Sequence, residues 1–163
     1  MSSEIMSLEM DVFCLLLLIR ILYQMYINRE QNDHWNYFYY TIAWACVYLF
    51  MDAIWIMNVK HFLTFSKIQS GIFNSFYFCS LAMLVCSWYV YVQKTLHSAV
   101  LKHKKILVLT FIPLIFFIGS SLLSYWTHGL FVIDQAGNYH RGKLLPFYFL
   151  ILFAYILYLS IKA

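Results

Sequence analysis

The sequence predicts an all-α, polytopic helical membrane protein with five transmembrane helices and a short extracytoplasmic hairpin before the last one. Of its 163 residues, 63% are hydrophobic and only 11% are charged. A soluble domain carries about 25% charged residues, so this chain has too few to cover a globule in water. The composition excludes soluble enzymes and disordered tails. The net charge of +4 is spread along the chain rather than gathered into one patch, so we expect no nucleic-acid partner.

The apolar residues form five runs, each close to the roughly 20 residues that a helix needs to cross a bilayer. None of the runs alternates polar and apolar residues with period two, which disfavours a membrane β-barrel. We therefore predict one transmembrane domain over residues 1–163, with helices at 12–28, 37–57, 71–93, 106–127 and 145–161.

The first run is predicted to be a retained helix rather than a cleaved signal peptide. Acidic residues precede it, namely Glu4, Glu9 and Asp11, and no Lys or Arg does. No cleavage site of the small-x-small type follows it.

The Lys and Arg residues of the loops predict the orientation. With five helices, the N-terminus, second loop and fourth loop share one side, which carries Lys60, Lys67, Arg141 and Lys143. The opposite side carries Arg29, Lys94, Lys102, Lys104, Lys105 and Lys162. Because the third loop is the most basic, we place it in the cytoplasm. The chain would then be a multi-pass protein of the cell membrane with its N-terminus outside and its C-terminus cytoplasmic.

Two charged residues, Arg20 and Asp52, lie inside the apolar runs. A charge at mid-helix costs on the order of 2.5–3.5 kcal/mol on insertion scales, so such residues rarely face lipid. One hypothesis is a buried ion pair between Arg20 and Asp52 across the first two helices. The alternative is that Arg20 extends to the interface while Asp52 is hydrated near it. A ligand or proton role for Asp52 is the third interpretation.

Small and hydroxylated residues recur at helical spacing on the third and fourth runs, including Asn74, Tyr77, Ser80, Gly119 and Ser124. Membrane helices use such faces for close packing and interhelical hydrogen bonds. Packing is the favoured interpretation, and the lining of a ligand cavity is the alternative.

No catalytic or metal-binding pattern is present. The four cysteines, Cys14, Cys46, Cys79 and Cys86, all fall within predicted helices, and the six histidines are scattered without ligand spacing. The sequence therefore predicts no metal, no cofactor and no enzymatic activity.

The fourth loop has the most distinctive sequence. Residues 134–137 suit a type I turn with Asp first and Gly last, between short strands at 131–133 and 138–140. His140 and Arg141 stand beside Tyr139 and could meet an anionic or aromatic ligand. A structural cap over the helices is the alternative. The candidate ligand or signal residues are Asp52, Trp55, Asp134, Tyr139 and Arg141.

Several short segments resemble one known family across residues 37 to 161. They are Asp52-Ala-Ile-Trp55, Asn74-Ser-Phe-Tyr77, Pro113 in the fourth run, Ser124 to Thr127, Phe131 to Asp134 and Tyr139 to Gly142. The pattern resembles the N-terminal multi-helix membrane sensor region of GGDEF-type diguanylate cyclases from clostridial and related Gram-positive bacteria. The resemblance implies a sensory, signal-transduction module of cyclic di-GMP signalling.

The Gly-Gly-Asp/Glu-Glu-Phe motif of the family's catalytic domain does not occur in these residues. We therefore expect a sensor that lacks its output domain, either as a fragment of a longer protein, a truncated gene product or a free-standing module. The expected partners are the lipid bilayer, a second copy of the chain and a missing or separate cytoplasmic output domain. The alternatives are a small membrane carrier half and a non-catalytic membrane assembly subunit.

Overall fold

The computed structural model describes residues 3–27, 33–59, 62–63, 65–96, 104–134 and 139–162. Their elements are α1 (Ser3–Ile27), α2 (Asp33–Val59), α3 (Lys67–Thr95), α4 (Lys104–Thr127), β1 (Phe131–Ile133), β2 (Tyr139–Arg141) and α5 (Leu145–Lys162). The predicted all-α class with five helices is confirmed, and so is a short hairpin before the last helix. The residues of its predicted turn, 135–138, lie outside the described part of the chain.

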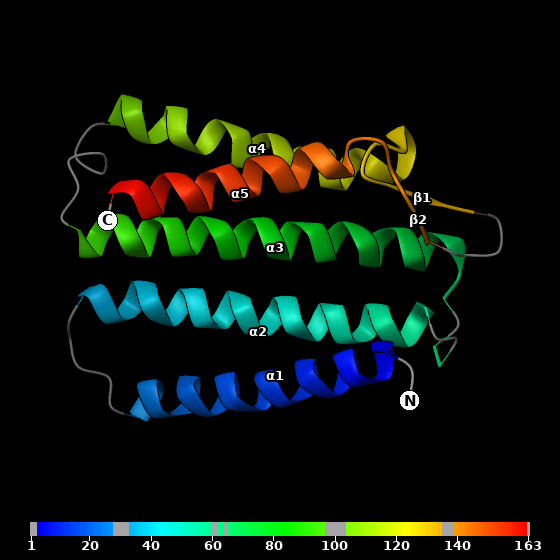
Figure 1. The fold of residues 1–163 in the computed structure, drawn as a ribbon, viewed down its shortest axis with the longest axis horizontal. Helices are drawn as coiled ribbons and strands as arrows, with labels where there is room; N and C mark the ends of the chain where they lie inside the picture. Colours follow the sequence, from blue (N-terminus) through cyan, green and yellow to red (C-terminus); the bar gives the residue numbers. More distant parts are fainter. Residues whose placement is uncertain are drawn as a thin grey trace.

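The helices lie roughly side by side, each antiparallel to the one before it in the chain (Figure 1). α1 stands at one edge of the row and packs against α2, while α3 at the centre contacts α2, α4 and α5. The start of α1 and the hairpin lie at the same end, and α5 runs to the opposite end. This topology agrees with the alternation of sides used to predict orientation.

The helices extend beyond the predicted runs. α1 begins at Ser3 rather than at residue 12, so the acidic segment before the apolar run is helical as well. α3 begins at Lys67 because Ser66 and Gln69 form a capping box. The Ser66 backbone N–H donates to Gln69 Oε1 at 2.9 Å, and the Ser66 hydroxyl accepts from the Gln69 backbone N–H.

Three helices in the described chain are long and apolar enough to cross a membrane, over Leu8–Ile27, Asn36–Asn58 and Lys67–Thr95. The described apolar segments of α4 and α5 are shorter, at Phe111–Thr127 and Leu145–Ala154. Large apolar side chains cover the outward faces of these helices, among them Leu16, Phe116 and Leu150. Outward apolar faces of this kind suit a lipid environment better than water.

Part of the charge pattern used for orientation cannot be located. Arg29, Lys60 and Lys102 lie outside the described residues, and the side chains of Lys104, Lys105 and Lys162 are not described either.

The buried core lies between α3, α4, α5 and the hairpin. It gathers Phe78 of α3, Phe117 of α4, Phe131 of β1 and Tyr148 of α5. The buried hydroxyl of Tyr148 donates to the backbone carbonyl of Phe78 at 2.6 Å. Because the polar end of Tyr148 is satisfied by α3, its ring can be buried without an unpaired donor.

Two glycines permit close approaches that a larger residue would block. A Cβ at Gly71 would overlap with the ring of Tyr125, where α3 meets α4. A Cβ at Gly142 would overlap with the backbone of Gly129 and Leu130. Gly142 therefore allows the chain to pass beneath the start of the hairpin on its way to α5.

Replacing Gly142 by Ala is expected to destabilise the fold by about 1–3 kcal/mol, as overpacking does in close-packed interiors. The clash is with backbone, which cannot rotate away. Thermal unfolding of the purified chain in detergent, followed by tryptophan fluorescence, measures the effect. Gly119→Ala is the matched control, since a Cβ there meets nothing within 4 Å and Ala favours a helix. Equal melting temperatures for the two variants would contradict the close approach.

Candidate functional site

The hairpin is attached to the end of α4 by one buried hydroxyl. Ser124 is 0% exposed, and its Oγ accepts from the backbone N–H of Leu130 at 2.8 Å and of Phe131 at 3.1 Å. The Gly142 N–H donates to the Leu130 carbonyl at 2.8 Å. The bonds from Leu130 and Phe131 attach the start of β1 to α4, and the bond from Gly142 joins the two ends of the hairpin.

The strands pair in antiparallel register, with Phe131 opposite Arg141 and Ile133 opposite Tyr139. The sequence predicts the first strand correctly, and the second ends at Arg141 rather than at residue 140. Phe131 and Ile133 are buried in the core. Burial of β1 therefore turns the hairpin across α3 and brings β2 over the neighbouring helices.

A cavity of about 380 Å³ lies beneath β2, between the hairpin and helices α2, α3 and α5. Its lining is mainly aromatic and apolar with a few polar groups, which is typical of small-molecule sites. The residues that matter most for its chemistry are Trp55, Asn74, Tyr77, Tyr139, Arg141 and Phe149.

Three rings from three different elements form one side of this cavity. The Trp55 and Tyr139 rings are nearly perpendicular, at 89° with centroids 5.6 Å apart. Trp55 and Tyr77 are stacked, with centroids 6.4 Å apart and an interplanar angle of 19°. Edge-to-face and offset arrangements of this kind are favoured by aromatic pairs. The cavity wall is thus a connected aromatic surface.

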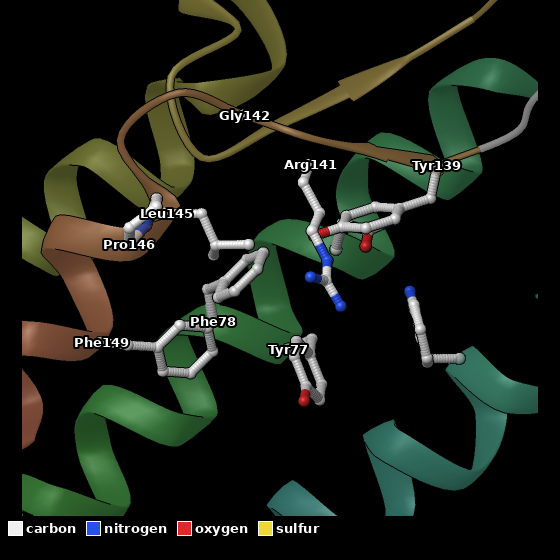
Figure 2. A pocket seen from close by; sticks show the side chains of 10 residues that line it. Tyr77, Phe78, Tyr139, Arg141, Gly142, Leu145, Pro146 and Phe149 are labelled. Carbon is white, nitrogen blue, oxygen red and sulfur yellow. The ribbon is translucent and has the colours of Figure 1, made fainter. Parts of the chain in front are cut away.

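Arg141 supplies the positive charge of the cavity. Figure 2 shows its side chain extending from β2 between Tyr139 and Tyr77. No carboxylate forms an ion pair with it in the part of the chain that the structure describes. Burial raises the pKa of the Tyr139 hydroxyl, and the charge of Arg141 lowers it by less. Tyr139 therefore remains a neutral hydroxyl at neutral pH, and the guanidinium is not neutralised by it.

Asn74 lines the same cavity but is almost fully buried, with its side chain 2% exposed. Its Nδ2 donates to the Ser70 carbonyl at 2.7 Å. Its Oδ1 has no hydrogen-bond partner among the described residues. Because less than 1 Å² of this oxygen is accessible, it does not face the open space of the cavity.

Tyr77 connects the cavity to a polar cluster between α1, α2 and α3. Its hydroxyl lies 3.2 Å from that of Tyr48 and hydrogen-bonds to the Asp52 carboxyl. Asp52 in turn contacts the Asp11 carboxyl of α1. Tyr77 thus links the cavity to Asp52 of α2, and Asp52 links it to α1.

The five candidate ligand residues separate into two groups. Trp55, Tyr139 and Arg141 all line the cavity, and Asp52 is linked to it through Tyr77. Asp134 does not line it. Its Oδ2 lies 3.5 Å from His140 Nε2, and both side chains are well exposed, at 37% and 62%. Such an exposed pair contributes little to stability.

The ion pair between Arg20 and Asp52 is not formed in the described chain. The Arg20 side chain is exposed on α1, and Asp52 contacts Asp11 instead. The reason is the early start of α1: Arg20 follows Ser3 by 17 residues, whereas Asp52 precedes Val59 by only 7. At 1.5 Å per residue the two differ in depth by roughly 15 Å.

Two polar groups of this site were not singled out as such from the sequence. In the sequence, Asp11 is one of three acidic residues that precede the first apolar run, and Asn74 is interpreted as a packing residue. The signal for Asp11 was its antiparallel position opposite Asp52 once the helix is extended to Ser3. No sequence signal distinguishes the unpaired oxygen of Asn74 from an ordinary packing contact.

Among the described residues, no group of three or more His, Cys, Asp or Glu side chains could hold a metal ion. Comparison of the chain with protein-family models, with curated proteins and with solved structures finds no match.

Replacing Ser124 by Ala is expected to destabilise the fold by about 1–3 kcal/mol, because two buried backbone N–H groups lose their acceptor. Ser120→Ala is the matched control on the same helix, since Ser120 donates only to the Phe117 carbonyl one turn earlier. Thermal unfolding in detergent measures both. A loss no larger for Ser124→Ala than for Ser120→Ala would show that Ser124 does not anchor the hairpin.

Proposed function

We propose that the chain is a multi-pass membrane sensory module that binds a small molecule in the cavity beneath β2. The observation that carries the proposal is the Arg141 side chain, a permanent cation that extends over an aromatic cavity without a carboxylate partner in the described chain. Arg141 is exposed on β2, so its guanidinium is open to a ligand that enters the cavity. A guanidinium presents a planar fork of donors that matches a carboxylate or phosphate group, and its place beside an aromatic cavity suits the recognition of an anion.

The proposed mechanism is a shift between two helix arrangements that differ in affinity for the ligand. The cavity is lined by Leu145, Pro146 and Phe149 at the start of α5, and α5 runs from there to the opposite end of the helices (Figure 1). A ligand that displaces these residues would therefore move α5 directly. Tyr77 provides a second route, through Asp52 and Asp11 to α1.

The sequence resemblance to the membrane sensor region of GGDEF-type diguanylate cyclases supports the same proposal. In that arrangement the cavity would face outward, the C-terminus would be cytoplasmic, and α5 would lead toward a cyclic di-GMP output domain. The chain itself would have no catalytic role. Its partners would be the bilayer, a second copy of the chain and the output domain.

A carrier half is the second candidate, and one observation favours it. Asp11 and Asp52 are carboxyl groups in contact within segments apolar enough to span a membrane, and intramembrane carboxyl groups often serve proton relays. A carrier would move its ligand into reconstituted vesicles, whereas a sensor would bind it without transport. An assembly subunit would do neither.

The sensory proposal is tested by fusing a diguanylate cyclase domain behind the chain and measuring cyclic di-GMP in cells that lack other cyclases. Arg141→Ala and Trp55→Ala are expected to change the cyclic di-GMP level under growth conditions in which the unmodified fusion responds. The reason is that they remove the cation and the aromatic wall of the cavity. Lys143→Ala is the matched control, since this exposed residue is close in sequence but does not line the cavity. Levels that are the same in all three variants and in the unmodified fusion would contradict the proposal.

A further inference from the structure

We infer that the cavity beneath β2 binds a small aromatic carboxylate. This inference rests on the proposed function, because it takes the cavity to be a ligand site. Two separate features of the lining specify the charge and the ring of the ligand.

The carboxylate is specified by Arg141. A guanidinium presents donors in a planar fork that matches a carboxylate with two parallel hydrogen bonds. No acidic side chain lines the cavity in the described chain, so the cation faces the space without a competing anion. Asp52 lies behind Tyr77, whose hydroxyl it accepts from. A cationic ligand would be repelled by Arg141.

The aromatic ring is specified by the shape and lining of the cavity. The perpendicular rings of Trp55 and Tyr139 offer a face and an edge, and Phe149 contributes a further ring to the lining. Planar molecules gain from such contacts beyond the area they bury. A volume of about 380 Å³ is at the small end of ligand cavities, which run from about 300 Å³ upward. It suits a one- or two-ring acid rather than a lipid or a dinucleotide.

The test uses three matched probes on the full chain in nanodiscs, with empty nanodiscs as the control for partition into lipid. Indole-3-acetate carries the ring and the carboxylate. Indole-3-acetamide lacks the charge, and cyclohexylacetate lacks the aromatic ring. Isothermal titration calorimetry is expected to show indole-3-acetate binding about tenfold or more tightly than the amide, as the loss of a charge-assisted hydrogen bond implies. It should also bind more tightly than cyclohexylacetate, which offers no planar ring to the aromatic lining.

Two variants assign these preferences to residues. Arg141→Ala is expected to abolish the preference for the acid over the amide while keeping the preference for indole-3-acetate over cyclohexylacetate. Trp55→Ala should do the reverse, and Lys143→Ala should change neither. Because the probe comparison is made on the unmodified chain, it does not depend on how well Trp55→Ala folds.

Equal affinities for the three probes, or no binding of any, would overturn the inferred ligand class. The proposed function fails separately, when Arg141→Ala and Trp55→Ala leave the cyclic di-GMP output of the fusion unchanged. If the fusion responds to these substitutions but none of the probes binds, the chain is a sensor whose ligand belongs to another chemical class.

Discussion

The two hydrogen bonds that the buried Ser124 hydroxyl accepts from Leu130 and Phe131 are the constraint on which the candidate site depends. They fix the start of β1 at the end of α4. The antiparallel register then places Tyr139 and Arg141 on β2, and burial of β1 against Phe78 orients the hairpin across α3. Without this attachment, β2 would have no defined position over the cavity.

α3 combines packing and site chemistry on one helix. Ser80 and Ser87 satisfy their hydroxyls by donating to carbonyls of their own helix, which lets neighbouring helices pack without unpaired donors. Asn74 and Tyr77, nearer the hairpin, line the cavity and contact Ser70, Tyr48 and Asp52. Packing therefore explains the polar residues around Ser80 and Ser87, and cavity lining explains Asn74 and Tyr77.

The architecture was predictable because it follows from local patterns. Five apolar runs indicate five helices, and the residue types of the fourth loop indicate a hairpin before α5. The register between α1 and α2 was not predictable, because the first apolar run begins at residue 12 whereas α1 begins at Ser3. The early start at Ser3 replaces the expected contact of Arg20 with Asp52 by one between Asp11 and Asp52.

The cavity was predictable only in part. Trp55, Tyr139 and Arg141 were chosen from their residue types, and they lie together because of the way the hairpin is attached. Asp134 was chosen on the same grounds but lies beside His140 on the exposed part of the hairpin. Which hairpin residues line the cavity depends on the direction in which β1 is buried, and a three-residue strand does not encode that direction.

The central claim is that the hairpin covers α2 and α3 and so creates the cavity. The most direct test is cross-linking between cysteines placed at residues 55 and 139, whose native rings lie 5.6 Å apart, in a chain whose four native cysteines are replaced by serine or alanine. A short bifunctional thiol reagent applied to membranes should join them within one chain, and a pair at 55 and 126 should react far less. Equal reaction of the two pairs, or none at 55 and 139, would contradict the account.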